Sequence, residues 1–176
     1  MFRGRAYDSI EHGWYSYLRD HTLVFVPNRL DQDFETLADQ LDALIITGGD
    51  DRVLRRTTEL KLATNMMIRQ KPIIGVCHGA FLLTDILGGT VGKKDGHRDG
   101  VEHMVLYNKQ EFAVNSYHGL YIKTPHNSAT VLATDHNGDC EAWIDNNLAG
   151  VVWHPERMGA PWLPSEIDNL LLKKST

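Results

Sequence analysis

A short apolar run, a cysteine between two glycines and a second apolar run follow one another in IIGVCHGAFLL, residues 73–83. The β-branched start predicts a buried strand, and the apolar spacing after the cysteine predicts a helix. Gly75 and Gly79 let the backbone turn sharply between the two elements. This order is typical of a nucleophile elbow, which projects one side chain over the edge of a sheet. We therefore expect Cys77 at the tip of the turn.

The position of Cys77 at the start of a helix suggests an activated thiol. Unpaired backbone N–H groups and the helix dipole favour the thiolate, so the sequence predicts a lowered pKa for Cys77. The alternative is a buried structural cysteine on an ordinary parallel strand, which is the commoner role of a lone cysteine. The flanking glycines favour the elbow.

A second segment, GVVWHPER at residues 150–157, offers the partners that a nucleophile needs. A short apolar strand ends on His154, Pro155 interrupts strand pairing, and Glu156 follows. A cysteine and a histidine whose imidazole is held by a carboxylate form the thiol version of a catalytic triad. We expect Cys77, His154 and Glu156 to be catalytic.

Four motifs carry a resemblance that covers nearly the whole sequence. In chain order they are IITGGDD at 45–51, GVCHG at 75–79, VNSYHG at 114–119 and WHPER at 153–157. With these motifs the chain resembles the class I glutamine amidotransferase superfamily, and more closely its γ-glutamyl hydrolase branch. The resemblance implies one domain over residues 1–176 with an α/β flavodoxin-like fold. The expected architecture is a three-layer sandwich around a mostly parallel central sheet.

The resemblance also assigns roles within the motifs. The backbone amides of Gly49 and His78 would form the oxyanion hole, although Gly48-Gly49 also fits a plain strand-to-helix turn. The loop after residue 115 would bind the α-amino and α-carboxylate groups of a glutamyl substrate through Ser116, Tyr117 and His118. His118 is a rival catalytic base, but the family pattern gives that role to His154, which Glu156 can orient.

Two positions depart from the family pattern in ways that bear on the substrate. Glutamine-using members usually have glutamine where this chain has Phe81, and commonly have another where it has Leu120. Apolar side chains remove hydrogen bonds to a polar substrate, which can cost a site orders of magnitude in discrimination. Phe81 therefore becomes a candidate substrate-binding residue, and free glutamine is expected to be a poor substrate.

The favoured function is hydrolysis of a γ-glutamyl amide bond in a small molecule by a Cys-His-Glu triad, without any cofactor. One alternative is a glutaminase subunit that delivers ammonia to a separate partner synthetase or transferase. Another is a catalytically silent binding domain, suggested by Phe81 and Leu120. A metal site at His97 and His103 is not expected, because their spacing fits no compact ligand set. The sequence leaves the oligomeric state and the leaving amine open.

Composition agrees with one globular domain of 176 residues, 42% hydrophobic and 23% charged. The net charge of −5 gives no reason to expect nucleic acid or an anionic membrane as partner. No apolar run approaches the roughly 18–20 residues needed to span a bilayer, and the start lacks a signal-peptide core, so a cytoplasmic location is expected. Two cysteines make no disulfide framework, and Cys140 is expected at the surface or a strand end.

The remaining pattern alternates helices and strands. Helices are predicted at 8–19, 34–41, 57–70 and 165–174, and strands at 23–26, 43–46, 111–115, 121–123, 129–133 and 141–144. The Asn-Gly at 137–138 predicts a hairpin between the last two strands, whereas 92–103 reads as an irregular segment. Relatives begin with a strand before the first helix. Here residues 1–5 form a shortened strand, or the sheet lacks one member and leaves an exposed edge.

Overall fold

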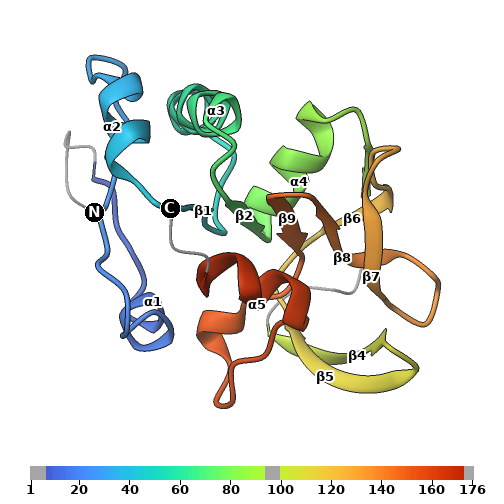
Figure 1. Cartoon of the computed structure of the whole chain (residues 1–176). Helices are drawn as coiled ribbons and strands as arrows, with labels where there is room; N and C mark the ends of the chain where they lie inside the picture. Colours follow the sequence, from blue (N-terminus) through green and yellow to red (C-terminus); the bar gives the residue numbers. More distant parts are fainter. Residues whose placement is uncertain (1–6, 94–99, 173–176) are drawn as a thin grey trace.

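The structure is a computed structural model that describes residues 7–93 and 100–172 (Figure 1). Its helices are α1 (Gly13–Tyr17), α2 (Phe34–Gln40), α3 (Val53–Ile68), α4 (His78–Ile86) and α5 (Ser165–Leu172), with a 3-10 turn η1 (Pro155–Arg157). Its strands are β1 (Leu44–Ile46), β2 (Ile73–Val76), β3 (Thr90–Lys93), β4 (Val101–Tyr107), β5 (Gln110–Ser116), β6 (Leu120–Thr124), β7 (Thr130–Thr134), β8 (Cys140–Asp145) and β9 (Leu148–Val151).

Three parallel strands position the candidate site. β2 pairs with β1 on one side, Ile46 opposite Gly75, and with β9 on the other, Val76 opposite Val151. The carboxyl ends of parallel strands meet at the same edge of a sheet. The loop at Gly48, the turn at Cys77 and the segment that leads to His154 therefore all begin at one edge.

The rest of the sheet is antiparallel, and the described strands join in one mixed sheet. β8 and β9 are joined by a two-residue turn in which Asn146 has φ 53°, and such a short connection can only bring the strands back antiparallel. The α/β class is confirmed, but among the described strands parallel pairing is limited to β1, β2 and β9. The sheet is therefore less parallel than we expected.

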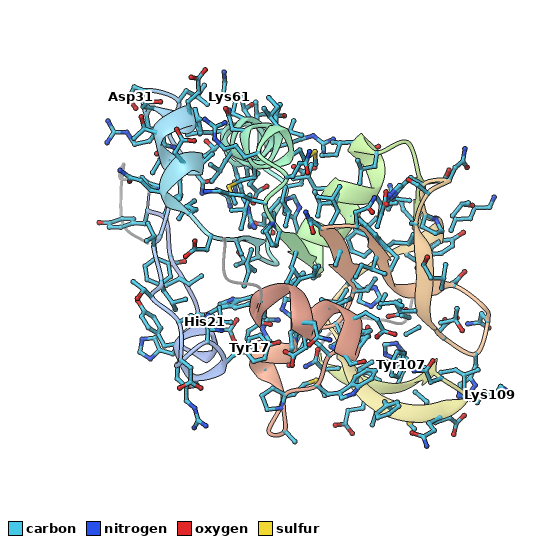
Figure 2. The ribbon with its side chains drawn as sticks, in the orientation of Figure 1. Tyr17, His21, Asp31, Lys61, Tyr107 and Lys109 are labelled. Atoms are coloured by element: carbon cyan, nitrogen blue, oxygen red, sulfur yellow. The ribbon has the colours of Figure 1, made fainter. Side chains whose placement is uncertain are left out.

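Helices cover both faces of the parallel strands, as Figure 1 shows with α3 and α4 on one side and α5 on the other. Every residue of β2 is buried, which explains its uninterrupted apolar sequence. Fully buried Leu82 and Leu83 on α4 pack into the same core, each worth about 1.5–3 kcal/mol. At the other end of the sheet, the hydroxyl of Tyr107 on β4 reaches α5 and contacts Ser165 at 3.0 Å (Figure 2).

The N-terminal region differs most from expectation. The first helix is limited to Gly13–Tyr17, and the predicted strand at 23–26 is wrong. That segment pairs with no described strand, and Val24 and Phe25 are 57% and 47% exposed. Between it and β1 runs a groove of about 1140 Å³, so the segment has no sheet neighbour to bind its backbone groups. Within the described residues β1 is an edge strand, and the shortened strand considered at 1–5 lies outside them.

Other elements match with shifted boundaries. α3 begins at Val53 rather than at residue 57, and the segment predicted as irregular carries the end of β3 and the start of β4 at its two ends. His97 lies outside the described residues. The hairpin of β7 and β8 is confirmed. No helix in the described ranges is both long and apolar enough to cross a lipid bilayer.

Candidate active site

Cys77 lies in a strained turn between β2 and α4. Its φ of 51° and ψ of −105° are rare for a residue with a side chain and cost about 1–3 kcal/mol. A Cβ on Gly75 would overlap the backbone of Gly79, and a Cβ on Gly79 would overlap the carbonyl of Ile46. Both glycines are therefore required by close backbone approach, and the predicted strand, turn and helix are confirmed.

The thiol of Cys77 is not activated in the resting structure. Its side chain is buried, and this burial raises the pKa to about 11, because an apolar surrounding disfavours the charged thiolate. A hydrogen bond from the His78 backbone N–H and the charge of Arg157 lower the pKa, but by less than burial raises it. The expected lowered pKa is therefore wrong, since desolvation outweighs the effect of the helix N-terminus.

His154 and Glu156 form a buried pair after β9, the strand that pairs with β2 just before the Cys77 turn. His154 Nδ1 and Glu156 Oε1 are 2.6 Å apart, and their side chains are 3% and 1% exposed. An ionised carboxylate only accepts hydrogen bonds, so the proton on this side of the ring belongs to Nδ1. Nε2 is then left as the basic nitrogen. Pro155 begins η1, whose tight turn places Glu156 back against the ring.

The backbone of His154 is clamped by Asn115, at the end of β5. Asn115 Nδ2 donates to the His154 carbonyl, and the His154 N–H donates to Asn115 Oδ1, both at 2.8 Å. Gly48 packs against the ring itself, since a Cβ there would overlap the imidazole Cε1. Sequence reasoning gave Asn115 no role, although it stands in one of the four motifs and directly precedes Ser116.

Tyr117 and Arg157 border the imidazole. The rings of Tyr117 and His154 meet edge to face with centroids 5.4 Å apart, and the Arg157 guanidinium lies 4.4 Å from the Tyr117 centroid. Arg157 also pairs with Glu11 at 2.8 Å. A cavity of about 230 Å³ opens here, and it is lined by Ser9, Ile10, Glu11, Trp14, Thr47, Gly48, His154, Glu156 and Arg157.

The other predicted site residues lie around this centre. Gly49 follows β1 with φ 131°, in the left-handed region that favours glycine. Ser116 is buried at the end of β5, and Tyr117 after it is 42% exposed. The His118 ring is buried, its Nδ1 lies 2.6 Å from the Leu120 carbonyl, and its centroid is 5.9 Å from that of buried Phe81. This bond to backbone makes His118 a weaker candidate base than His154.

Two further expectations concern metal and the second cysteine. No cluster of three or more His, Cys, Asp and Glu side chains within residues 7–93 and 100–172 is arranged to hold a metal ion. Cys140 begins β8, as expected of a strand end, but it is 3% exposed and so not at the surface. Its sulfur contacts the Ala142 carbonyl, and burial raises its pKa to about 12.

Comparisons with known proteins identify relatives of this chain. The chain is 25% identical over 143 residues to a gamma-glutamyl-CDP-amidate hydrolase of Campylobacter jejuni, a match that covers 75% of this chain and 70% of that protein. It is 26% identical over 138 residues to the pyridoxal 5'-phosphate synthase subunit PdxT of Bacillus licheniformis, covering 66% and 69% of the two chains.

Solved structures and a family model complete the comparison. The crystal structure of a GMP synthase subunit from Thermoplasma acidophilum superposes with a TM-score of 0.70 at 20% identity, over 92% of this chain and 85% of that one. This likeness shows the fold. The model of the family Glutamine amidotransferase class-I matches residues 5–174. The chain therefore belongs to the class I glutamine amidotransferase family.

Proposed function

We propose that this protein hydrolyses a γ-glutamyl amide bond through a thioester on Cys77, with the whole chain acting as one catalytic domain. The observation that carries the proposal is the pairing of a strained elbow cysteine with the buried His154–Glu156 couple at the same edge of the sheet. Family membership supports amide-bond chemistry, and the Campylobacter relative is named for a γ-glutamyl substrate.

The first half of the reaction forms the thioester. Because the resting thiol is protonated, His154 Nε2 takes the thiol proton as the sulfur attacks the γ-carbonyl carbon. The carbonyl oxygen becomes an oxyanion that accepts hydrogen bonds from the Gly49 and His78 amides. When the intermediate collapses, the C–N bond breaks and His154 returns the proton to the departing nitrogen.

The second half releases glutamate. A water molecule attacks the thioester carbon while His154 takes one of its protons, and the same two amides hold the oxyanion again. The C–S bond then breaks, and the sulfur recovers its proton from His154. Glu156 keeps Nδ1 protonated throughout, which stabilises the imidazolium that forms twice in the cycle.

The surroundings of Phe81 favour a conjugate over free glutamine. Phe81 is buried against the His118 ring, so this wall offers an aromatic surface where a hydrogen-bonding side chain would hold a small polar substrate. Ser116, Tyr117 and His118 would hold the glutamyl end. A γ-glutamyl amide with a larger leaving amine can make additional contacts beyond Phe81 and His118, which free glutamine is too small to make.

A second candidate function is that of a glutaminase subunit. Its support is that one of the relatives is a subunit of a synthase. In that case the ammonia released at Cys77 would pass to a partner protein, and hydrolysis would depend on the presence of that partner.

The test is glutamate release from a panel of substrates: free glutamine, γ-glutamyl-p-nitroanilide and several γ-glutamyl amines. Wild type is compared with Cys77→Ala and with Cys140→Ala, which removes the other buried cysteine. We expect release from at least one conjugate at a higher kcat/KM than from glutamine. We also expect loss in Cys77→Ala and wild-type rates in Cys140→Ala.

Other outcomes separate the alternatives. Release from glutamine alone favours the subunit function, and release that survives in Cys77→Ala contradicts the mechanism. Absence of release from every substrate contradicts the stand-alone hydrolase and leaves the partner-dependent and silent alternatives.

A further inference from the structure

Three side chains that the mechanism does not use form a connected group between α3 and α4. Glu59 Oε1 accepts a hydrogen bond from Arg55 Nε at 2.7 Å, and Glu59 Oε2 lies 2.8 Å from His78 Nε2. The carboxylate accepts from both neighbours, so the His78 ring carries its proton on Nε2. The side chains of Arg55, Glu59 and His78 are 17%, 13% and 8% exposed, which makes this a largely desolvated network.

At its Arg55 end the network holds the loop after β1, which contains Gly48 and Gly49. Arg55 Nη2 donates to the Thr47 carbonyl at 2.6 Å, directly before Gly48. Arg55 Nη1 occupies the space that a Cβ on Gly49 would fill, so this nitrogen of the guanidinium packs against that residue. Arg55 thus contacts the loop that carries one proposed oxyanion donor, while His78 carries the other.

We propose that Arg55, Glu59 and His78 form an oxyanion brace, which fixes the Gly49 and His78 amides relative to each other. The inference rests on the proposed function, because it concerns the oxyanion of that reaction. Arg55 and Glu59 are positioning residues, since neither touches the reacting atoms. The His78 side chain would do the same for its own backbone amide.

The need for such a brace follows from the chain path. The two donors belong to loops after different strands, and each is followed by a separate helix. A donor must lie within about 0.5 Å of its productive place to stabilise an oxyanion, and loss of one donor costs about 10²–10³ in kcat. One carboxylate on α3 joins both loops through charge-assisted bonds, which are stronger than neutral ones.

A plain surface ion pair on the same helix provides the contrast. Arg56 pairs with Asp85 at 2.6 Å, spans α3 and α4 as the brace does, and faces solvent. Arg56 also contacts Asp51 at 3.3 Å, farther along the loop after β1, but none of the contacts that the structure gives it is with Gly49 or His78. Arg56→Lys is therefore the matched control for Arg55→Lys, and Asp85→Asn for Glu59→Gln.

The experiment measures kcat, KM and Cys77 alkylation for the brace variants on the best γ-glutamyl substrate. We expect Glu59→Gln and His78→Leu to lower kcat about 30- to 100-fold with KM within about threefold of wild type. Iodoacetamide alkylation of Cys77 forms no oxyanion and should stay within about twofold. His78→Gln keeps an N–H donor toward Glu59 and should recover part of the loss, whereas Arg56→Lys should match wild type.

Two results would overturn the brace. One is a kcat for Glu59→Gln and His78→Leu within about threefold of wild type, and the other is an alkylation rate that falls by the same factor as kcat. If Glu59→Gln does not fold, His78→Leu and Arg55→Lys answer the same question, since each breaks one end of the network.

The amide NMR signals of Gly49 and His78 test the brace in the absence of catalysis. They therefore distinguish an error in the brace proposal from an error in the proposed function. In folded Glu59→Gln the signals of both Gly49 and His78 should shift from their wild-type positions, and in Asp85→Asn neither should. Wild type that releases no glutamate contradicts the function, yet paired shifts would still support the brace. Unchanged signals in Glu59→Gln would refute it even in an active enzyme.

Discussion

The thiol of Cys77 shows how far one residue's surroundings can reverse a prediction made from its neighbours in sequence. The position before a helix favours the thiolate, but burial raises the pKa to about 11. In the proposed mechanism the proton therefore leaves during the reaction, toward His154, rather than before it. This makes the alkylation rate of the free enzyme a direct report on burial.

Alkylation of Cys77 by iodoacetamide should rise about tenfold per pH unit from pH 7 to pH 10, since only the thiolate reacts and its fraction grows in that way below the pKa. Mass spectrometry of the labelled peptide gives the rate, and Cys140 in the same sample provides an internal comparison. A rate that levels off near neutral pH would show a lowered pKa and contradict this structure.

Gly48 offers a second test at the residue scale. A methyl group there would overlap the His154 imidazole, so Gly48→Ala should displace the ring and lower kcat by about 100-fold or more. Gly159→Ala is the control, because a Cβ at that position meets nothing within 4 Å. Glutamate release and thermal unfolding of both variants separate displacement of the base from loss of the fold. Equal activity in the two would mean that the ring adapts.

Among the elements, β5 and the segment after β9 are joined through Asn115. Asn115→Leu removes two hydrogen bonds and leaves the His154 N–H and carbonyl buried without them, which should cost about 1–3 kcal/mol in the free energy of unfolding. Urea unfolding measures this cost. Asn127, in the turn before β7, is exposed, and Asn127→Leu should leave stability nearly unchanged. A similar loss in both variants would contradict the clamp.

The elements that could be predicted are those whose structure is determined by residues close together in the sequence. The elbow follows from glycines beside Cys77, and the β7–β8 hairpin follows from its Asn-Gly turn. The sequence alone could not exclude a strand at 23–26, because the apolar residues there fit a strand. Only the lack of a neighbouring strand among the described residues excludes it. The brace was missed for a similar reason, since Glu59 and His78 meet only after α3 and α4 pack.

For the whole molecule, the two buried cysteines predict a loss of stability in alkali. Burial raises the pKa of Cys77 to about 11 and that of Cys140 to about 12, from an ordinary value of 9.0. Above pH 9 the unfolded chain loses these protons first, so the stabilisation present below pH 9 is lost as pH rises through 11 and 12. The contribution of Cys77 alone is about 3 kcal/mol.

Urea unfolding at pH 8 and pH 10.5 tests this dependence. Wild type should lose more of its unfolding free energy between the two pH values than a variant with both cysteines replaced by alanine. Other groups that titrate in this range, such as the lysines, are common to both proteins and cancel in the comparison. An equal loss would mean that the thiols are as accessible in the folded state as in the unfolded one.

The protonation of Cys77 also determines how fast the protein reacts with hydrogen peroxide. Hydrogen peroxide oxidises thiolates to sulfenic acid, and with a pKa of about 11 only about one Cys77 in ten thousand is a thiolate at pH 7. The resting protein should therefore keep its activity through oxidative stress that inactivates enzymes with a preformed thiolate. In the proposed mechanism, the same burial that slows the thiol toward small reagents leaves it to react with a bound substrate while His154 accepts its proton.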